Sequence, residues 1–225
     1  MRVISLESGR VTLLFPFEET VPLGGVDGPV VVNAITEKYN FARPPDLSVP
    51  REELNKNGIK FENGRIDFEG GRVNIGSFTV YSDGIVVEAN TTERASAFLD
   101  ELIPWLRSKF GFRDFTTPTK QYFLSQIVVE FDRPIAKLIS GYEKMATAIN
   151  SELSQIYGQI QGPMDFARLD FEFDRATTGL QTPIPRFILE RRAGVSFAQE
   201  RYFAGAPMQT SRHIAVLESI ENLVP

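Results

Sequence analysis

The sequence predicts an α+β fold in which an antiparallel, partly mixed sheet is covered on one face by two long helices and a C-terminal helix. Three observations lead to this prediction. Residues 59–89 alternate short β-branched runs with turn residues, which is typical of an antiparallel meander. Residues 91–109 and 133–157 carry apolar side chains at spacings of three and four, the period of an amphipathic helix. Residues 122–131 and 166–203 supply further strands.

Length and composition limit the class of protein. The 225 residues suffice for one large domain or two small ones. The chain has no cysteine, which excludes disulfides, thiolate metal sites and cysteine nucleophiles. Its 24 Lys and Arg against 29 Asp and Glu make it weakly acidic, which argues against duplex nucleic acid as the main partner. We see no secretory leader and no run of 18 apolar residues, and we therefore expect a cytoplasmic protein without membrane insertion.

The first 45 residues are predicted to be a hairpin element that either extends the main sheet or caps it. Residues 1–45 form an expected β-hairpin element, 46–58 a proline-rich connector, and 59–225 an α+β domain, with a single domain over 1–225 as the alternative. The hairpin is predicted to turn at residues 7–9. The β-branched run from Val30 to Thr36 predicts a further strand.

The meander and the first long helix carry local signals. Asn63 and Gly64 predict a two-residue hairpin turn, because both positions of a type I′ turn need a positive φ. Asn90, with Glu93 three residues later, has the spacing of a capping box at the start of the helix. Trp105, the only tryptophan, is interpreted as a core anchor.

The segment from residue 126 to 157 is expected to be the centre of the fold. A buried strand is followed by the longest stretch of helical period in the sequence. Asp132 is predicted to cap the helix, and Pro134 is a favourable first helical residue. Gly141 is expected in mid-helix, at a close approach of backbones. The apolar stripe of this helix requires a partner surface. The string Ile-Val-Val-Glu at 85–88 recurs at 127–130, a weak indication of an internal repeat.

Residues 169–174 alternate apolar and acidic side chains. In a strand, Leu169, Phe171 and Phe173 would then pack on one side. Asp170, Glu172 and Asp174 would lie on the other. The simpler interpretation of the acids is a row of exposed ion pairs; the alternative is a divalent metal site, which would suit a metal-dependent hydrolase.

Arginines are frequent in the last third of the chain. A tight hairpin about Ala193 and Gly194 would set Arg186 opposite Arg201, and these like charges would need acidic neighbours from the 170–174 row. The alternative is that arginines bind a small anionic ligand. The candidate set is Arg186, Arg191, Arg192, Arg201 and Arg212.

The functional hypothesis with most support is a non-enzymatic interaction or assembly protein that binds another protein or its own copy. It is favoured because the chain has one histidine, His213, and no nucleophile-elbow, zinc-protease or nucleotide-binding motif, so no catalytic residue or cofactor is assigned. Sheet edges are candidate surfaces, as are Phe15, Phe17 and Phe41, which lie at predicted strand ends and loops where exposed aromatics would mark an interaction surface. The anion binder and the hydrolase are the alternatives.

Overall fold

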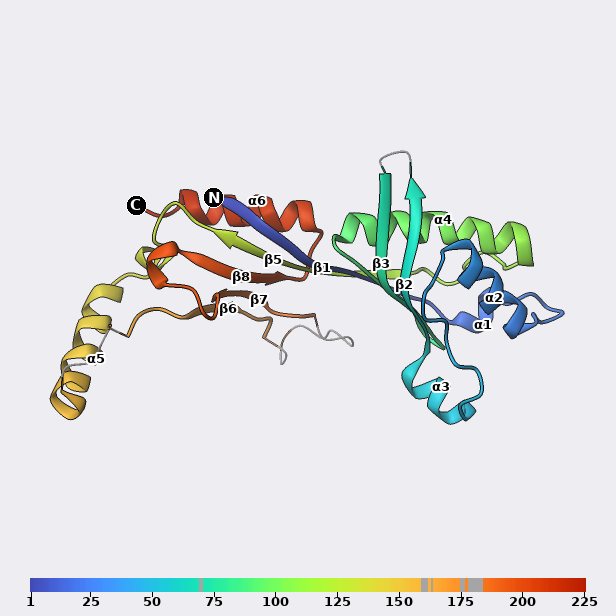
Figure 1. Ribbon diagram of the computed structural model, residues 1–225, viewed down its shortest axis with the longest axis horizontal. Helices are drawn as coiled ribbons and strands as arrows, with labels where there is room; N and C mark the ends of the chain where they lie inside the picture. Colours follow the sequence, from blue (N-terminus) through green and yellow to red (C-terminus); the bar gives the residue numbers. More distant parts are fainter. Residues whose placement is uncertain (69–70, 159–161, 163, 175–176, 178–183) are drawn as a thin grey trace. The chain divides into compact units, whose positions relative to one another are not determined.

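The computed structural model describes residues 1–68, 71–158, 162, 164–174, 177 and 184–225. These residues form the predicted α+β fold, with an eight-stranded antiparallel sheet in the order β2-β3-β4-β1-β5-β8-β7-β6 (Figure 1). The strands are β1 (Arg2–Leu14), β2 (Ile59–Phe68), β3 (Gly71–Tyr81), β4 (Gly84–Ala89), β5 (Lys120–Glu130), β6 (Arg168–Phe171), β7 (Phe187–Arg191) and β8 (Arg201–Ala206). The helices are α1 (Phe17–Thr20), α2 (Gly28–Lys38), α3 (Arg51–Asn57), α4 (Thr92–Phe110), α5 (Tyr142–Tyr157) and α6 (Thr210–Asn222), with short 3-10 helices η1 (Ile135–Leu138) and η2 (Phe197–Gln199). Among them we find no helix with the length and apolar character needed to cross a bilayer.

The chain divides into two compact units that interleave in sequence. Unit 1 comprises Met1–Leu6, Gln126–Ala206 and Ser211–Pro225. Unit 2 comprises Glu7–Ser125 and Pro207–Thr210. Each unit has its own apolar core.

Unit 2 contains the meander, and its core is built around aromatic rings. Phe98 of α4 is fully buried, and its ring lies 4.9 Å from that of Tyr39 and 5.5 Å from that of Phe78, measured between centroids. Phe41 meets the same ring edge-on at 6.4 Å. Such edge-to-face pairs add to the free energy gained by burying their area.

Close approach of β1 to the start of α4 explains Gly9. A Cβ atom at Gly9 would lie 2.1 Å from the backbone carbon of Thr91, so a larger residue does not fit. Thr91 caps α4 by accepting a hydrogen bond from the Arg94 amide at 3.2 Å, one residue later than the predicted cap Asn90.

The predicted hairpin turn at Asn63 and Gly64 is wrong, because both residues lie inside the continuous strand β2. Asn63 has the expected positive φ of 57°, yet its carbonyl accepts the Ala42 amide at 3.2 Å instead of closing a turn. Gly64 is required because the ring of Phe41 lies against it, 2.4 Å from where a Cβ atom would be. Residues 69–70, between β2 and β3, lie outside the described residues.

Two expectations for the N-terminal third are also wrong. Residues 2–14 form one strand with no turn at 7–9. The predicted strand at 30–36 is helix α2, in which Asp27 accepts a hydrogen bond from the Val30 amide at 3.2 Å and Pro29 occupies the first turn. These start signals outweigh the weak helix preference of valine, which costs less than about 1 kcal/mol per residue.

Unit 1 packs α6 on strands β5, β7 and β8. Its buried core residues are Ile127, Val129, Phe131, Ile135, Leu189, Tyr202, Ala204, Leu217 and Val224. Leu169 of β6 packs against this core, but Phe171 and Phe173 are exposed, so the predicted packing face of residues 169–174 is wrong beyond Leu169.

The predicted single helix over 133–157 is also wrong. Residues Ile135–Leu138 form η1, and α5 begins only after Gly141. Gly141 has a φ of 76°, a left-handed conformation that interrupts the α-helical path and is readily adopted by glycine. No residue of α5 is buried, so the expected packing of this helix on the sheet is not observed.

We expect Phe98→Ala to destabilise unit 2 by about 3 to 5 kcal/mol, the usual cost of deleting a buried phenylalanine. Urea unfolding followed by the fluorescence of Trp105, which belongs to the same unit, measures the change. Leu23→Ala, at an exposed position of unit 2, is the matched control and should change the free energy of unfolding by less than about 0.5 kcal/mol. Equal effects of the two substitutions would contradict the core described above.

Candidate functional site

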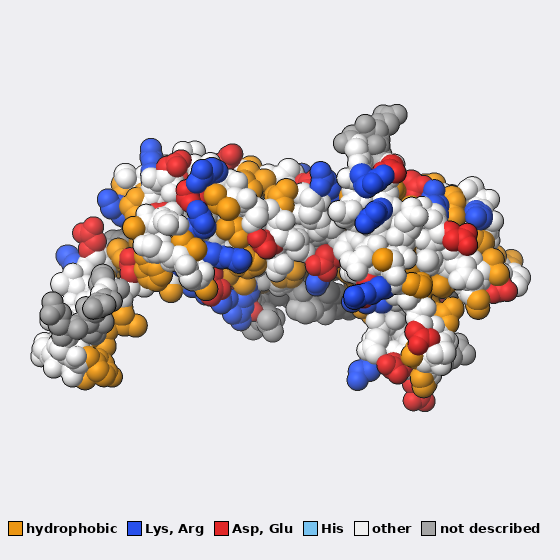
Figure 2. Space-filling view, in the orientation of Figure 1, with side chains coloured by type: hydrophobic (Ala, Val, Ile, Leu, Met, Phe, Trp, Pro, Cys, Tyr) orange, Lys and Arg blue, Asp and Glu red, His pale blue; other side chains and the backbone are white. Residues whose placement is uncertain are grey.

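Helix α5 presents apolar side chains to solvent. Met145, Ile149 and Ile156 recur at spacings of four and seven on one side of the helix, and we call them the α5 stripe. They are 51%, 50% and 67% exposed. Tyr157 at the helix end is 72% exposed, and Figure 2 shows hydrophobic side chains at this end of α5. An amphipathic helix whose apolar side is exposed is typical of a surface that binds a partner.

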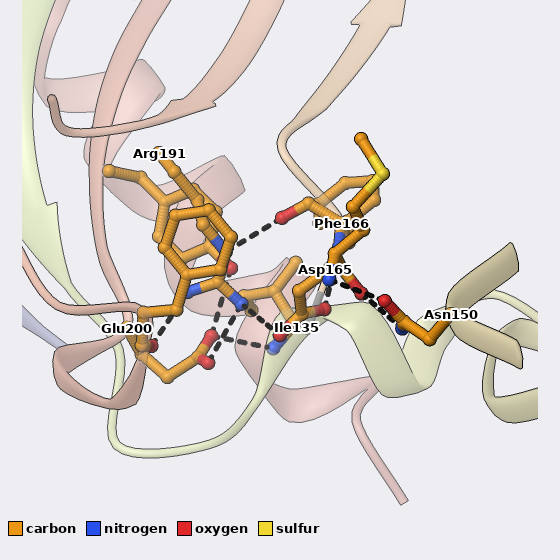
Figure 3. Close-up of polar contacts among 9 residues, drawn as sticks. Ile135, Asn150, Asp165, Phe166, Arg191 and Glu200 are labelled. Carbon is orange, nitrogen blue, oxygen red and sulfur yellow. Dashed lines mark hydrogen bonds and ion pairs between the residues drawn. The ribbon is translucent and has the colours of Figure 1, made fainter. Parts of the chain in front are cut away.

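Asn150 fixes how α5 lies in unit 1. Its side-chain nitrogen donates to the Met164 carbonyl at 2.9 Å, and its side-chain oxygen accepts the Met164 amide at 2.7 Å (Figure 3). This two-bond contact joins the middle of α5 to the chain segment that precedes β6. The side of the helix that carries Asn150 is therefore held by the chain itself, and the α5 stripe is left outside.

Arg191 anchors the same segment from the other side. Its Nε donates to the Phe166 carbonyl at 2.7 Å and its Nη1 to the Phe197 carbonyl at 2.7 Å. Its Nη2 meets Glu200 at 3.1 Å, and the guanidinium lies 4.4 Å from the centre of the Phe197 ring (Figure 3). The arginine side chain is only 5% exposed, so this is a buried ion pair with its donors directed at partners within the chain.

Glu200 connects the ion pair to η1 and β8. Its second carboxylate oxygen accepts the Ile135 amide at 3.2 Å and the Tyr202 hydroxyl at 2.9 Å. Burial, reinforced by the charge of Glu200, raises the pKa of Tyr202 above its usual value, so this hydroxyl remains a proton donor. Glu200 adopts a left-handed conformation with a φ of 45°. The cluster thus joins η1, β7, β8 and the segment that holds α5.

The loop between β7 and β8 differs from the predicted tight hairpin. Arg191 pairs with Tyr202, and η2 lies between the strands. Arg201 therefore faces Arg192 through a backbone hydrogen bond, and its guanidinium binds Glu130 at 2.7 Å. The predicted opposition of Arg186 and Arg201 is wrong because the loop is longer than two residues.

The candidate arginines do not converge on one point. Arg186 precedes β7 and binds Glu172 at 2.7 Å, whereas Arg191 ends the strand, about 16 Å away at 3.3 Å per residue. Arg192 is exposed at the start of the following loop, and Arg212 is exposed on the first turn of α6. The predicted acidic neighbour of Arg186 is observed.

Two of the three acids proposed for a metal bind arginine side chains. Asp170 binds Arg168 at 2.8 Å, and Glu172 binds Arg186. The Asp174 carbonyl accepts the Thr177 amide at 3.2 Å. Throughout the part of the chain that the structure describes, no group of three His, Asp or Glu side chains is arranged to hold a metal ion.

The predicted aromatic surface is wrong. Phe15 and Phe41 are buried in the core of unit 2, and Phe17 is partly buried against it. These residues lie at the ends of a strand and of helices. The core of this unit extends to those ends, and the three rings therefore pack against it.

His213 is buried within unit 1, with its ring 5.8 Å from that of Phe187. Loss of solvation on burial lowers its pKa from 6.5 to about 4. The histidine is therefore neutral at neutral pH and belongs to the packing of α6.

Comparison with known proteins finds no family model that matches the chain and no curated protein that is similar to it. The α5 stripe and its charged neighbours therefore carry the functional argument on their own geometry. The stripe was recognised in the sequence, but its exposure was not. The sequence also places Lys144 and Glu152 at equal distances on either side of Ala148, a signal that sequence reasoning missed.

We expect Arg191→Ala to destabilise unit 1 by about 3 kcal/mol, because it leaves the Glu200 carboxylate, only 15% exposed, without its cation. Urea unfolding followed by circular dichroism measures the change. Arg192→Ala is the matched control, an exposed arginine one residue away, and should have an effect below about 0.5 kcal/mol. A small effect of both substitutions would show that the ion pair does not support the fold.

We expect His213 to reduce stability in acid. Its folded pKa of about 4 is below the unfolded value of 6.5, so the unfolded chain binds the proton first and stability falls as pH drops from 6.5 towards 4. Between pH 7 and pH 5 the loss is about 2 kcal/mol. NMR titration of the single histidine gives its pKa, and urea unfolding of His213→Leu should show a smaller loss over this pH range. A folded pKa above 6 would contradict the prediction.

Proposed function

We propose that the chain is an assembly protein that pairs with a second copy of itself through α5. The observation that carries this proposal is the α5 stripe, which leaves three large apolar side chains half or more exposed on one helix. Burying such a stripe against another surface is the usual source of free energy for helix association.

Two charges of α5 are placed symmetrically along the helix about Ala148. Lys144 and Glu152 each lie four residues from Ala148. If two copies of α5 pair antiparallel about a two-fold axis at Ala148, each Lys144 lies opposite Glu152 of the other copy. Ion pairs beside an apolar seam are the usual determinant of partner choice and orientation between helices.

A membrane surface is a poorer fit for the same helix. Helices that lie on anionic membranes carry several Lys or Arg residues on their polar face. Lys144 is the only basic residue of α5, and Glu143 and Glu152 are acidic. The charges of α5 therefore favour a protein partner.

The expected interface is small. The 16 residues of α5 span about 24 Å at 1.5 Å per residue, and a contact strip about 10 Å wide covers about 240 Å². Stable interfaces bury about 800 Å² on each partner. We therefore expect weak association that increases with protein concentration. Unit 1 has further exposed apolar surface at Phe171, which ends the edge strand β6, and at Phe173, two residues later.

The other two hypotheses have less support. Arg186, Arg191 and Arg201 each bind a carboxylate of the chain itself, and Asp170 and Glu172 each bind an arginine. A cytoplasmic location is part of the proposal.

Charge reversal tests the pairing. We expect Lys144→Glu and Glu152→Lys each to weaken association about tenfold, because each places like charges opposite one another twice in the dimer. The double variant restores the pairs and should recover most of the affinity. Sedimentation velocity from micromolar to millimolar protein measures the dissociation constant.

Two further variants control this experiment. Glu143→Lys makes the same chemical change at a position that, in this register, is level with the uncharged Leu153 of the other copy, and it should leave association unchanged. Ile149→Asp should abolish it, since it places a charge beside the axis. A monomer at every concentration, or a double variant no better than the single ones, would overturn the proposal.

A further inference from the structure

Unit 2 contains an apolar cavity that the pairing of α5 does not use. It has a volume of about 150 Å³ and lies among α2, α4 and the meander. Nearly all of its accessible wall is apolar. A cavity of this size with apolar walls stays dry and accommodates a benzene-sized molecule.

Aromatic rings form a large part of the wall. The ring centroids of Phe15 and Phe115 lie 4.7 Å apart, and those of Phe61 and Phe78 lie 5.4 Å apart. An aromatic ligand among such rings gains edge and face contacts in addition to the burial of its surface. The phenylalanines of the lining are Phe15, Phe17, Phe61, Phe78, Phe112 and Phe115.

The cavity reaches the surface of unit 2 between the segment before α2 and the end of α4. Val26 belongs to the lining and is 36% exposed. Gly28 and Arg113 also belong to the lining and are exposed. A small molecule can therefore enter from solvent without unfolding the core.

Two of the polar side chains in the lining are directed at the chain itself. The Thr20 hydroxyl donates to the Phe17 carbonyl at 2.8 Å. Arg113 donates through Nε to the Val21 carbonyl at 2.8 Å and through Nη2 to the Glu18 carbonyl at 3.3 Å. These contacts leave the Thr20 hydroxyl proton and two donor atoms of Arg113 engaged outside the cavity.

Arg107 also offers little to a ligand. Its Nη1 binds Asp114 at 2.7 Å, and its Nε is buried where a molecule in the cavity does not reach it. A charged ligand would therefore lose its hydration and gain no matching hydrogen bonds, which is costly. The lining thus selects against ions.

We propose that this cavity binds a small, neutral, apolar molecule with an aromatic ring, about the size of benzene or toluene. The ring lies among the phenylalanines of the lining and the aliphatic side chains of α2 and α4. Removal of apolar surface from water on both sides supplies the free energy of binding. The inference concerns unit 2 and does not rest on the pairing of α5.

Two probes with the same ring separate a neutral ligand from a charged one. Isothermal titration compares toluene with benzoate. We expect toluene to bind with a dissociation constant below about 1 mM, because small apolar ligands gain much free energy per buried atom. Benzoate should bind at least about tenfold more weakly, because its carboxylate loses hydration. Absence of heat from toluene up to its solubility, or equal affinity for the two probes, would overturn the proposal.

Substitutions locate the binding. Val31→Phe, in the lining, should fill part of the cavity and abolish toluene binding. Val30→Phe adds the same side chain one residue away, at a 52% exposed position outside the lining, and should leave toluene binding unchanged. Equal binding by these two variants would place the ligand elsewhere and overturn the proposal.

A second filling variant covers the case in which Val31→Phe does not fold. The fluorescence of Trp105 during urea unfolding shows whether unit 2 remains folded. Leu106→Phe enlarges a side chain on the α4 side of the cavity and should also abolish toluene binding. Unchanged toluene affinity in a folded Leu106→Phe variant would overturn the proposal.

Discussion

The buried ion pair between Arg191 and Glu200 is the contact on which the arrangement of unit 1 most depends. It joins β7 and β8 to η1 and to the segment before β6. That segment then holds α5 through Asn150. Because an arginine offers donors in a fixed planar geometry, one side chain can set the positions of several chain segments at once. The orientation of the exposed helix follows from this buried polar cluster, whereas the apolar core fixes the sheet.

The strands could be predicted from sequence more reliably than the features that connect them. Alternation and β-branched runs identified the meander and β5, because each strand buries one face. The sequence did not reveal that Asn63 and Gly64 lie within a strand, since their need for a special backbone arises from the Ala42 amide and the Phe41 ring, which come from a distant part of the chain. In α2 the signals for the start of the helix, Asp27 and Pro29, are local. The β-branched valines that follow them led instead to the prediction of a strand.

The candidate site was predictable only in part, because the exposure of its side chains depends on distant parts of the chain. The spacing of Met145, Ile149 and Ile156 identifies an apolar stripe from sequence alone, but the buried or exposed state of a stripe depends on what lies beside it. Gly141 decides the outcome here. Its left-handed conformation ends the path from η1, so α5 begins as a separate helix instead of continuing a long one.

Exposing an apolar stripe to water costs free energy. Burial of the stripe against a partner offsets that cost. The charges around α5 favour a defined partner over non-specific association. Lys144 and Glu152 lie opposite one another only in an antiparallel pair centred on Ala148. A parallel pair places each lysine beside the other lysine and each glutamate beside the other glutamate, which is unfavourable. The same two residues therefore favour one arrangement and oppose another, and this combination is characteristic of interfaces with a defined partner.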